Sequence, residues 1–267
     1  MSESNRDYHA DHGAVSHSML EVFSRSPRLF QGRFVTQTIE PDPPTPELLL
    51  GSVVHTCVLE PERLEEDYVI CEAKTRAGKL WDAAAQDAAS SGRTAVLESV
   101  VHQSHRIAEA IHSCQRAQSM LAADGPVEES LRWQRGDVAC KLRADKIIND
   151  ERFGGWIGVV DLKTAADPSK EAFERAAASY GYHRQAAWYI DGIEATYELP
   201  AVFYWIVIGK SEPFDVCVYK ASDAMLASGR AQNTALLERL EMCFTTGEWL
   251  LPEQAELTEL NLPKWAQ

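Results

Sequence analysis

The sequence has no stretch near the roughly 18 consecutive apolar residues that a membrane span requires. Residues 1–17 are polar and lack the apolar core of a secretory signal. No segment repeats at a period of about 20–50 residues, which excludes the common repeat architectures. We therefore expect a soluble, cytoplasmic protein with no membrane partner.

Basic residues are also scarce. Lys and Arg number 26 against 40 Asp and Glu, which gives a formal net charge of −14. This balance argues against a surface coated with basic residues for nucleic acid. It leaves room for a local basic channel, because the distribution of charge matters more than its sum.

Closely spaced cysteine pairs are absent too, since none of the six cysteines lies in a C-x-x-C motif. In an intracellular chain of 267 residues such cysteines are expected to be reduced and mostly buried. They are Cys57, Cys71, Cys114, Cys140, Cys217 and Cys243.

What the sequence does contain is an ordinary globular composition, with 45% hydrophobic and 25% charged residues. We expect a single domain over residues 1–267. Its expected parts are an N-terminal helix and loop (1–45), a helical part (46–123) with a polar loop at 73–93, a sheet with helices (124–250) and a tail (251–267).

Helical and strand patterns alternate along the chain. Periodicity and capping signals predict helices at 16–30, 46–59, 95–122, 170–191 and 222–244. Strand patterns occur at 127–133, 138–149, 156–163, 201–208 and 214–219, with a turn at 150–155. This order predicts an α/β or α+β fold with a mixed β-sheet flanked by helices.

Two acidic residues lie on neighbouring predicted strands. Asp145 lies in one strand, and Asp161 follows the hydrophobic run 156–160 in the next. Side chains alternate along a strand, so Asp161 and Lys163 point to the same side while Leu162 points into the core. Charged groups at the end of a buried strand need partners or a metal to offset their desolvation.

Carboxylates on adjacent strands can hold a hard cation such as Mg²⁺ or Mn²⁺. A lysine beside them can lower the pKa of an attacking water and offset charge that builds on a phosphate. The ordinary alternative is a salt-bridged hairpin, in which Asp161 pairs with Lys163 or Asp145 pairs with Arg143.

Asp145 followed by Asp161-x-Lys163 resembles the signature of PD-(D/E)xK nucleases, in the D-x-K form of RecB-like exonucleases. Two helix motifs extend the resemblance, because residues 51–55 are similar to its G-x-x-x-H motif and residues 185–189 to its Q-x-x-x-Y motif. Segments 16–20, 59–62 and 181–189 are similar, more narrowly, to the RecE (exodeoxyribonuclease VIII) nuclease domain of phage recombination systems.

The resemblance implies a restriction-endonuclease-like core and a Mg²⁺-dependent exodeoxyribonuclease, for which Mn²⁺ would substitute. It also implies 5′→3′ digestion of double-stranded DNA ends, producing 3′ overhangs for a single-strand-annealing recombinase. A homo-oligomeric ring (trimer or tetramer) is implied as well, with a basic lumen inside an acidic exterior. Some RecB-like relatives hold an iron–sulfur cluster with three C-terminal cysteines; because only Cys243 lies in that region, no cluster is expected here.

The resemblance also assigns roles to residues. Asp145 and Asp161 would hold the metal, assisted by His55, Glu128 and the main-chain carbonyl of Leu162. Lys163 would position and activate the attacking water.

Two of these assignments also follow from local patterns. Gly51 and Ser52 lie about one turn before His55, and their small side chains leave room around the imidazole. In the strand at 127–133, Glu129 shares the apolar face, which leaves Glu128 free to approach a metal. Glu129 would replace it if the register slipped by one residue.

The helix that follows the lysine strand presents polar and aromatic groups on one face. Tyr182, Gln185 and Tyr189 share a narrow arc at about 100° per residue. Gln185 and Tyr189 would orient the water or the phosphodiester, and Tyr182 would bind DNA. Tyr180 and Trp188 fit an aromatic core stripe instead.

Basic residues cluster locally in the N-terminal part and in the polar loop. Arg28, Arg76 and Lys79 are candidates for contact with DNA phosphates. Other functions stay open: a structure-specific nuclease, an AddB-like or CRISPR-associated nuclease of other polarity, or a catalytically silent DNA-binding scaffold on the same fold. The presence of Asp145, Asp161 and Lys163 together argues against a catalytically inactive scaffold.

Overall fold

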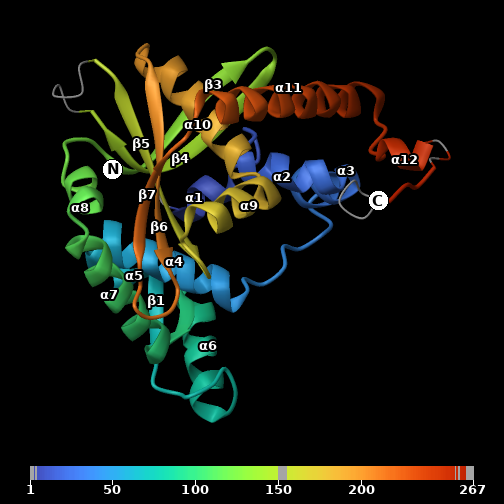
Figure 1. Ribbon diagram of the computed structural model, residues 1–267. Helices are drawn as coiled ribbons and strands as arrows, with labels where there is room; N and C mark the ends of the chain where they lie inside the picture. Colours follow the sequence, from blue (N-terminus) through green and yellow to red (C-terminus); the bar gives the residue numbers. More distant parts are fainter. Residues whose placement is uncertain (1–2, 4, 150–154, 256, 258, 263–267) are drawn as a thin grey trace.

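The computed structural model of the chain describes residues 3, 5–149, 155–255, 257 and 259–262. It is an α/β fold built on a mixed five-stranded sheet with the strand order β3-β4-β5-β6-β7 (Figure 1). The β5–β6 pair is parallel and the other pairs are antiparallel. The strands are β3 (Val127–Arg135), β4 (Val138–Ile148), β5 (Ile157–Ala165), β6 (Ala201–Gly209) and β7 (Val216–Lys220). The mixed sheet predicted from the sequence is confirmed, although residues 150–154 of the expected turn lie outside the described residues.

Helices cover both faces of this sheet. One core contains residues of α2 (His17–Arg25), α9 (Lys170–Tyr180), α10 (Tyr182–Tyr197) and α11 (Asp223–Thr246). The other core contains residues of α4 (Pro46–Leu59), α7 (Glu98–Ser113) and α8 (Gln115–Leu121). Successive residues of β5 serve different cores, since Val159 belongs to the first and Val160 to the second. A strand covered on both sides is hydrophobic at nearly every position, as the run 156–160 predicted.

Short elements complete the fold. They are α1 (Asn5–Ala10), α3 (Pro27–Phe30), a π-helix (Gln31–Val35), a 3₁₀-helix (Pro61–Arg63), α5 (Leu64–Asp67) and α12 (Pro252–Ala255). The predicted start of α4 is confirmed: the side chain of Thr45 accepts the N–H of Leu48, and Pro46 occupies the first helical position.

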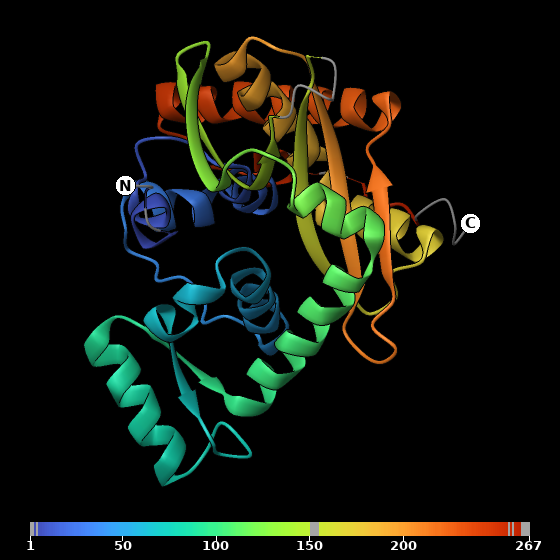
Figure 2. The same cartoon turned by 90° about the vertical axis from the view of Figure 1, so that its left-hand side faces the viewer.

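A small lobe stands away from the main sheet and was not predicted (Figure 2). It consists of β1 (Tyr68–Cys71) and β2 (Thr94–Leu97), which pair in parallel, and of α6 (Lys79–Ser91). The expected loop at 73–93 is therefore wrong over most of its length. The segment forms a helix because it is rich in alanine, and the apolar side chains that recur on its less exposed face are mostly small, with only Ala88 fully buried.

Three predicted helices are interrupted. The helix expected at 95–122 begins as strand β2 and then breaks at Cys114 between α7 and α8. The helix expected at 16–30 breaks at Ser26, whose extended backbone ends α2 and whose side chain caps α3. The helix expected at 170–191 breaks at Gly181, which takes a left-handed conformation (φ 71°). This last break places Tyr182 in the first turn of α10.

The six cysteines are free, and four of them are buried, as predicted for reduced thiols. Among the described residues, no helix combines the length and the apolar character needed to cross a membrane.

Candidate active site

The acidic residues form one row across three neighbouring strands. Val127 pairs with Lys146 and Glu129 with Ala144, so the register sets Glu128 opposite Asp145. The last pair between β4 and β5 joins Lys146 to Val160, and the same register carried one residue further sets Asp145 opposite Asp161. Glu128, Asp145 and Asp161 therefore lie at one level of the sheet.

The strands β4 and β5 separate at this level. Only three residue pairs join them, whereas β5 stays paired with β6 along its whole length. Beyond the last pair, Oδ2 of Asp145 accepts the main-chain N–H of Leu162 at 2.7 Å. A side chain thus takes the place of a ladder bond, and the carboxylate is fixed at the point where the sheet opens.

His55 approaches this opening from α4. Its Nε2 lies 3.0 Å from the carbonyl oxygen of Leu162, and its Nδ1 lies 3.5 Å from Oδ2 of Asp145. Burial lowers the pKa of His55, which favours the neutral imidazole. A neutral ring that donates from Nε2 to the carbonyl turns the lone pair of Nδ1 toward the carboxylate, an arrangement that a cation between them would stabilise.

Three candidate metal ligands converge here. One ligand atom from each of His55, Glu128 and Asp145 lies within 4.8 Å of the other two. Glu128, and not Glu129, joins this group. Glu128 takes a left-handed backbone conformation (φ 50°), which is uncommon for a residue other than glycine and typical of functional sites.

Asp161 is not part of that group of three. Its Oδ1 accepts a hydrogen bond from Nε2 of Gln185 at 3.0 Å, and its Oδ2 lies 2.6 Å from Nζ of Lys163. Asp161 and Lys163 thus form the salt bridge that the sequence left open as the ordinary alternative to a metal site. The other two acids of the row, Glu128 and Asp145, lie beside this salt bridge. The carbonyl of Leu162, also expected to hold the metal, is engaged by His55 and keeps one further lone pair.

The protein compensates the charges of the row only in part: Glu128 and Asp161 have basic partners, whereas Asp145 has only His55 within ion-pair distance among the described residues. Burial and the neighbouring Asp161 raise the pKa of Asp145, and burial together with Asp145 raises the pKa of Glu128. Burial works to lower the pKa of Lys163, but the charges of Asp161 and Asp145 outweigh it and raise that pKa. Carboxyl groups that resist ionisation at close range indicate a place for a divalent cation, and oxygen ligands with one imidazole fit Mg²⁺ or Mn²⁺.

Arg143 holds Glu128 in place, a role that the sequence did not suggest. Its Nε donates to Oε2 of Glu128 at 2.7 Å, and its Nη1 donates to the carbonyl of Glu3 and to Oγ of Ser130. The alternative pairing of Arg143 with Asp145 is wrong, because the guanidinium faces Glu128.

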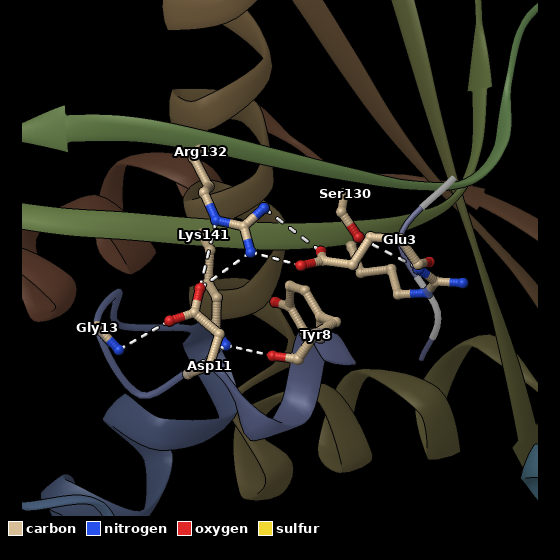
Figure 3. A network of polar contacts seen from close by, with 8 residues as sticks. Glu3, Tyr8, Asp11, Gly13, Ser130, Arg132 and Lys141 are labelled. Carbon is tan, nitrogen blue, oxygen red and sulfur yellow. Dashed lines mark hydrogen bonds and ion pairs between the residues drawn. The ribbon is translucent and has the colours of Figure 1, made fainter. Parts of the chain in front are cut away.

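The N-terminal segment is attached to the sheet beside this arginine (Figure 3). Arg132 of β3 forms ion pairs with Glu3 and Asp11 at 2.6 and 2.9 Å. The buried ammonium of Lys141 donates to the carbonyls of Tyr8 and Asp11 and lies over the Tyr8 ring. These contacts place α1 along the edge of the site.

Glu128, Asp145 and Lys163 line a cavity of about 1430 Å³, and Asp161 is buried behind its wall. Tyr182, Gln185 and Tyr189 all line it, as their shared helix face predicted. The hydroxyl of Tyr189 donates to the carbonyl of Arg143 at 2.9 Å, and the ring of Tyr182 lies 5.1 Å from Nζ of Lys163.

The basic residues proposed for DNA contact lie elsewhere. Arg28, Arg76 and Lys79 are exposed and do not belong to the cavity wall. The wall contains other basic or imidazole side chains that sequence reasoning missed, since no local pattern distinguishes them from solvated residues. They are Arg6, His9, His17, Arg63, Arg143 and Lys210.

The core position expected for Tyr180 is also wrong. Its side chain is 58% exposed and lines the cavity, because α9 ends at this residue and the chain turns at Gly181. The core position expected for Trp188 is confirmed, since Trp188 is fully buried and donates its indole N–H to the carbonyl of Lys141.

Comparisons with known proteins agree with this architecture. Residues 16–261 match the model of a family described as "PDDEXK-like domain of unknown function (DUF3799)". A crystal structure from Eubacterium rectale, named "Putative exonuclease", superposes with a TM-score of 0.67 at 16% identity and covers 98% of this chain and 96% of its own. The structure of SSO0001 covers 70% of this chain and 86% of its own at 15% identity, but its TM-score of 0.29 is too low to indicate a shared fold. No curated protein matches in sequence. The PD-(D/E)xK-like fold predicted from the sequence is thus confirmed.

Proposed function

Because the chain belongs to the family of PDDEXK-like domains of unknown function (DUF3799), we propose that it is a metal-dependent deoxyribonuclease. The observation that carries the proposal is the row of Glu128, Asp145 and Asp161 across β3, β4 and β5, with Lys163 at its end. Arg143 pairs with Glu128 and Lys163 pairs with Asp161, whereas Asp145 faces only His55 among the described residues. Glu128, Asp145 and His55 line the open cavity, and their ligand atoms lie within 4.8 Å of one another.

Asp145, Glu128 and His55 would hold the cation, with Asp161 and the carbonyl of Leu162 at the next positions; the short distances among the first three support this assignment. When bound, Mg²⁺ or Mn²⁺ would neutralise these carboxylates and polarise the phosphodiester. Arg143 fixes the rotamer of Glu128, and the N–H of Leu162 fixes that of Asp145.

Lys163 serves the attacking water. Its ammonium, held by Asp161, offsets negative charge as the water oxygen bonds to phosphorus and the bond from phosphorus to the 3′ oxygen breaks. The products are a 3′-hydroxyl and a 5′-phosphate. Gln185 orients Asp161 through its amide, while Tyr189 and Tyr182 form the adjoining wall.

The finer proposal is a 5′→3′ exonuclease on double-stranded DNA ends that leaves 3′ overhangs for a single-strand-annealing recombinase. It rests on the sequence resemblance to the RecE nuclease domain. A ring of three or four copies would reconcile the net charge of −14 with DNA binding by enclosing a basic lumen. Arg28, Arg76 and Lys79 would then contact phosphates outside the cavity.

Digestion of end-labelled duplexes tests this proposal. Linear duplexes labelled at either the 5′ or the 3′ end are compared with covalently closed circles, with Mg²⁺ and with EDTA. We expect mononucleotide release from the 5′ end, no attack on circles and no activity in EDTA. Size-exclusion chromatography with light scattering tests the ring, which a monomer that binds no DNA at physiological salt would contradict.

The alternatives give different products. A structure-specific nuclease would cut junctions or flaps internally, and a nuclease of other polarity would release the 3′ label first. A catalytically silent scaffold would bind DNA but leave every substrate intact.

A further inference from the structure

Tyr180 is a large aromatic residue that the fold leaves unburied. At 58% exposure it stands at the end of α9, in the wall of the cavity that contains Asp145 and Lys163. Among the described residues its ring contacts one other ring, that of Tyr182, with centroids 5.7 Å apart and planes 34° from parallel. Its other face is turned to the cavity and the solvent.

The contact with Tyr182 continues inward as a series of rings. Tyr182 lies 5.8 Å from Phe173 at 31°, and Phe173 stacks on Tyr219 at 5.6 Å and 13°. The hydroxyl of Tyr219 donates to the carbonyl of Pro168, and Phe173 belongs to the main core. Tyr180 is thus the outermost member of a series of adjoining, partly tilted rings with a fixed inner end, and a further flat ring could extend it.

The series of rings passes beside the ammonium group of Lys163. The ring of Tyr182 lies 5.1 Å from Nζ of Lys163, so a single ring separates the lysine from Tyr180. A phosphate held near Lys163 would leave its own or the adjacent base within reach of the free face of Tyr180.

We propose that Tyr180 stacks on the nucleobase next to the scissile phosphate, so that the DNA strand enters the site unpaired. The proposal rests on the function proposed above and specifies its substrate as a single-stranded or frayed end. Every base offers a π-face, so this contact tolerates any sequence, which suits an enzyme that must advance along arbitrary DNA. A base in the interior of a duplex could not use it, because its neighbours occupy both of its faces.

The test measures binding apart from cleavage. The parent protein carries Asp161→Asn, which removes the carboxylate charge that pairs with Lys163 and is expected to suppress hydrolysis, with its folding checked by thermal melting. Single-stranded oligonucleotides and blunt duplexes carry 2-aminopurine at the terminal position. Fluorescence anisotropy gives Kd, and quenching of 2-aminopurine reports stacking.

We expect Tyr180→Ala to weaken binding about tenfold, as loss of one stacked base implies, and to abolish the quenching. Tyr180→Phe should preserve both signals, because it keeps the ring. Phe244→Ala is the matched control: Phe244 is 56% exposed on α11 and lies outside the cavity wall, so its removal should change neither signal.

The outcomes separate the two proposals. If Tyr180→Ala binds and quenches like its parent while the wild-type chain digests DNA, the stacking role is overturned and the nuclease stands. If quenching depends on Tyr180 but the wild type cleaves nothing, the stacking role stands and the nuclease fails. If the parent binds no DNA and the wild-type chain leaves every substrate intact, both are overturned.

Discussion

Asp145 accepts the main-chain N–H of Leu162 at 2.7 Å, although the two residues belong to strands that have already ceased to pair. The position of Asp145 is therefore set by the separation of β4 and β5, because its side chain accepts the N–H that the separation leaves without a strand partner. The opening that interrupts the sheet is filled by the group that would hold the cation, and Asp161 immediately precedes the N–H donor.

The substitution Asp145→Asn should separate stability from metal binding. The amide oxygen can still accept the N–H of Leu162, while loss of a buried charge beside Asp161 relieves repulsion. In EDTA we expect the melting temperature to rise by about 2–4 °C, or about 1 kcal/mol. Added Mn²⁺ should raise the wild-type melting temperature but leave the variant unchanged. Equal stabilisation of both proteins would exclude Asp145 as a ligand.

The pKa of Asp145 makes the metal-free fold depend on pH. Burial and Asp161 raise this pKa from its ordinary value of 3.8 to about 7, so between these two values the folded state holds a proton that the unfolded state has lost. Stability should therefore fall as the pH rises through this range, by about 1.4 kcal/mol for each pH unit. Burial and Asp145 raise the pKa of Glu128 and add in the same direction.

A cation reverses this trend, since it binds the deprotonated carboxylates. We expect Mn²⁺ to stabilise the protein weakly near about pH 5.5 and strongly near about pH 8, as measured by thermal melting with and without the ion. In the Asp145→Asn variant, the stabilisation by Mn²⁺ should depend less on pH. A stabilisation by Mn²⁺ that is constant over this range would contradict the assignment.

Arg143 should affect metal affinity without contacting the metal. The substitution Arg143→Met removes the donor that orients Glu128 and should weaken Mn²⁺ binding about 10- to 100-fold by calorimetry. Arg132→Met is the matched control, because Arg132 pairs with Glu3 and Asp11 but makes no contact with Glu128. Equal losses in the two variants would show a general effect of the N-terminal segment.

Substitution of two glycines by alanine should change the stability of the protein in opposite directions. A Cβ at Gly229 would lie 2.2 Å from the carbonyl oxygen of His183, so Gly229→Ala should force α10 and α11 apart at a cost of about 2–3 kcal/mol. A Cβ at Gly51 would meet nothing closer than 3.8 Å, and Gly51→Ala should stabilise α4 by about 0.5–1 kcal/mol. Urea unfolding measures both. If Gly229→Ala left the free energy of unfolding unchanged, the two helices could not be packed as described.

The sequence predicted the features that depend on local spacing. The five strands, the start of α4 at Pro46 and the common face of Tyr182, Gln185 and Tyr189 all follow from periodicity or capping, and all are confirmed. Strand alternation also favoured Glu128 over Glu129, and Glu128 does lie beside Asp145 and His55; its role as a metal ligand stays a prediction.

Features that depend on distant contacts could not be predicted. Arg143 bonds to Glu3, 140 positions away in the chain, and no local pattern marks such a pair. Helix α6 packs against a small lobe through mostly small side chains and buries only Ala88, so its apolar face was easy to miss. Tyr180 resembled a core residue because the break at Gly181 was not foreseen. The basic residues of the cavity wall come from elements that only the fold brings together.

We propose that the acidic row and Lys163 together hydrolyse DNA. The most direct test is the rate of digestion of a linear duplex by the wild-type chain, by Asp145→Asn and by Lys163→Met, each with Mg²⁺ and with EDTA. We predict digestion by the wild type with Mg²⁺ alone, and losses of at least about a hundredfold in both variants, whose folding is verified by melting. Digestion that persists in the variants or in EDTA, or a wild type that leaves the duplex intact, would contradict the account.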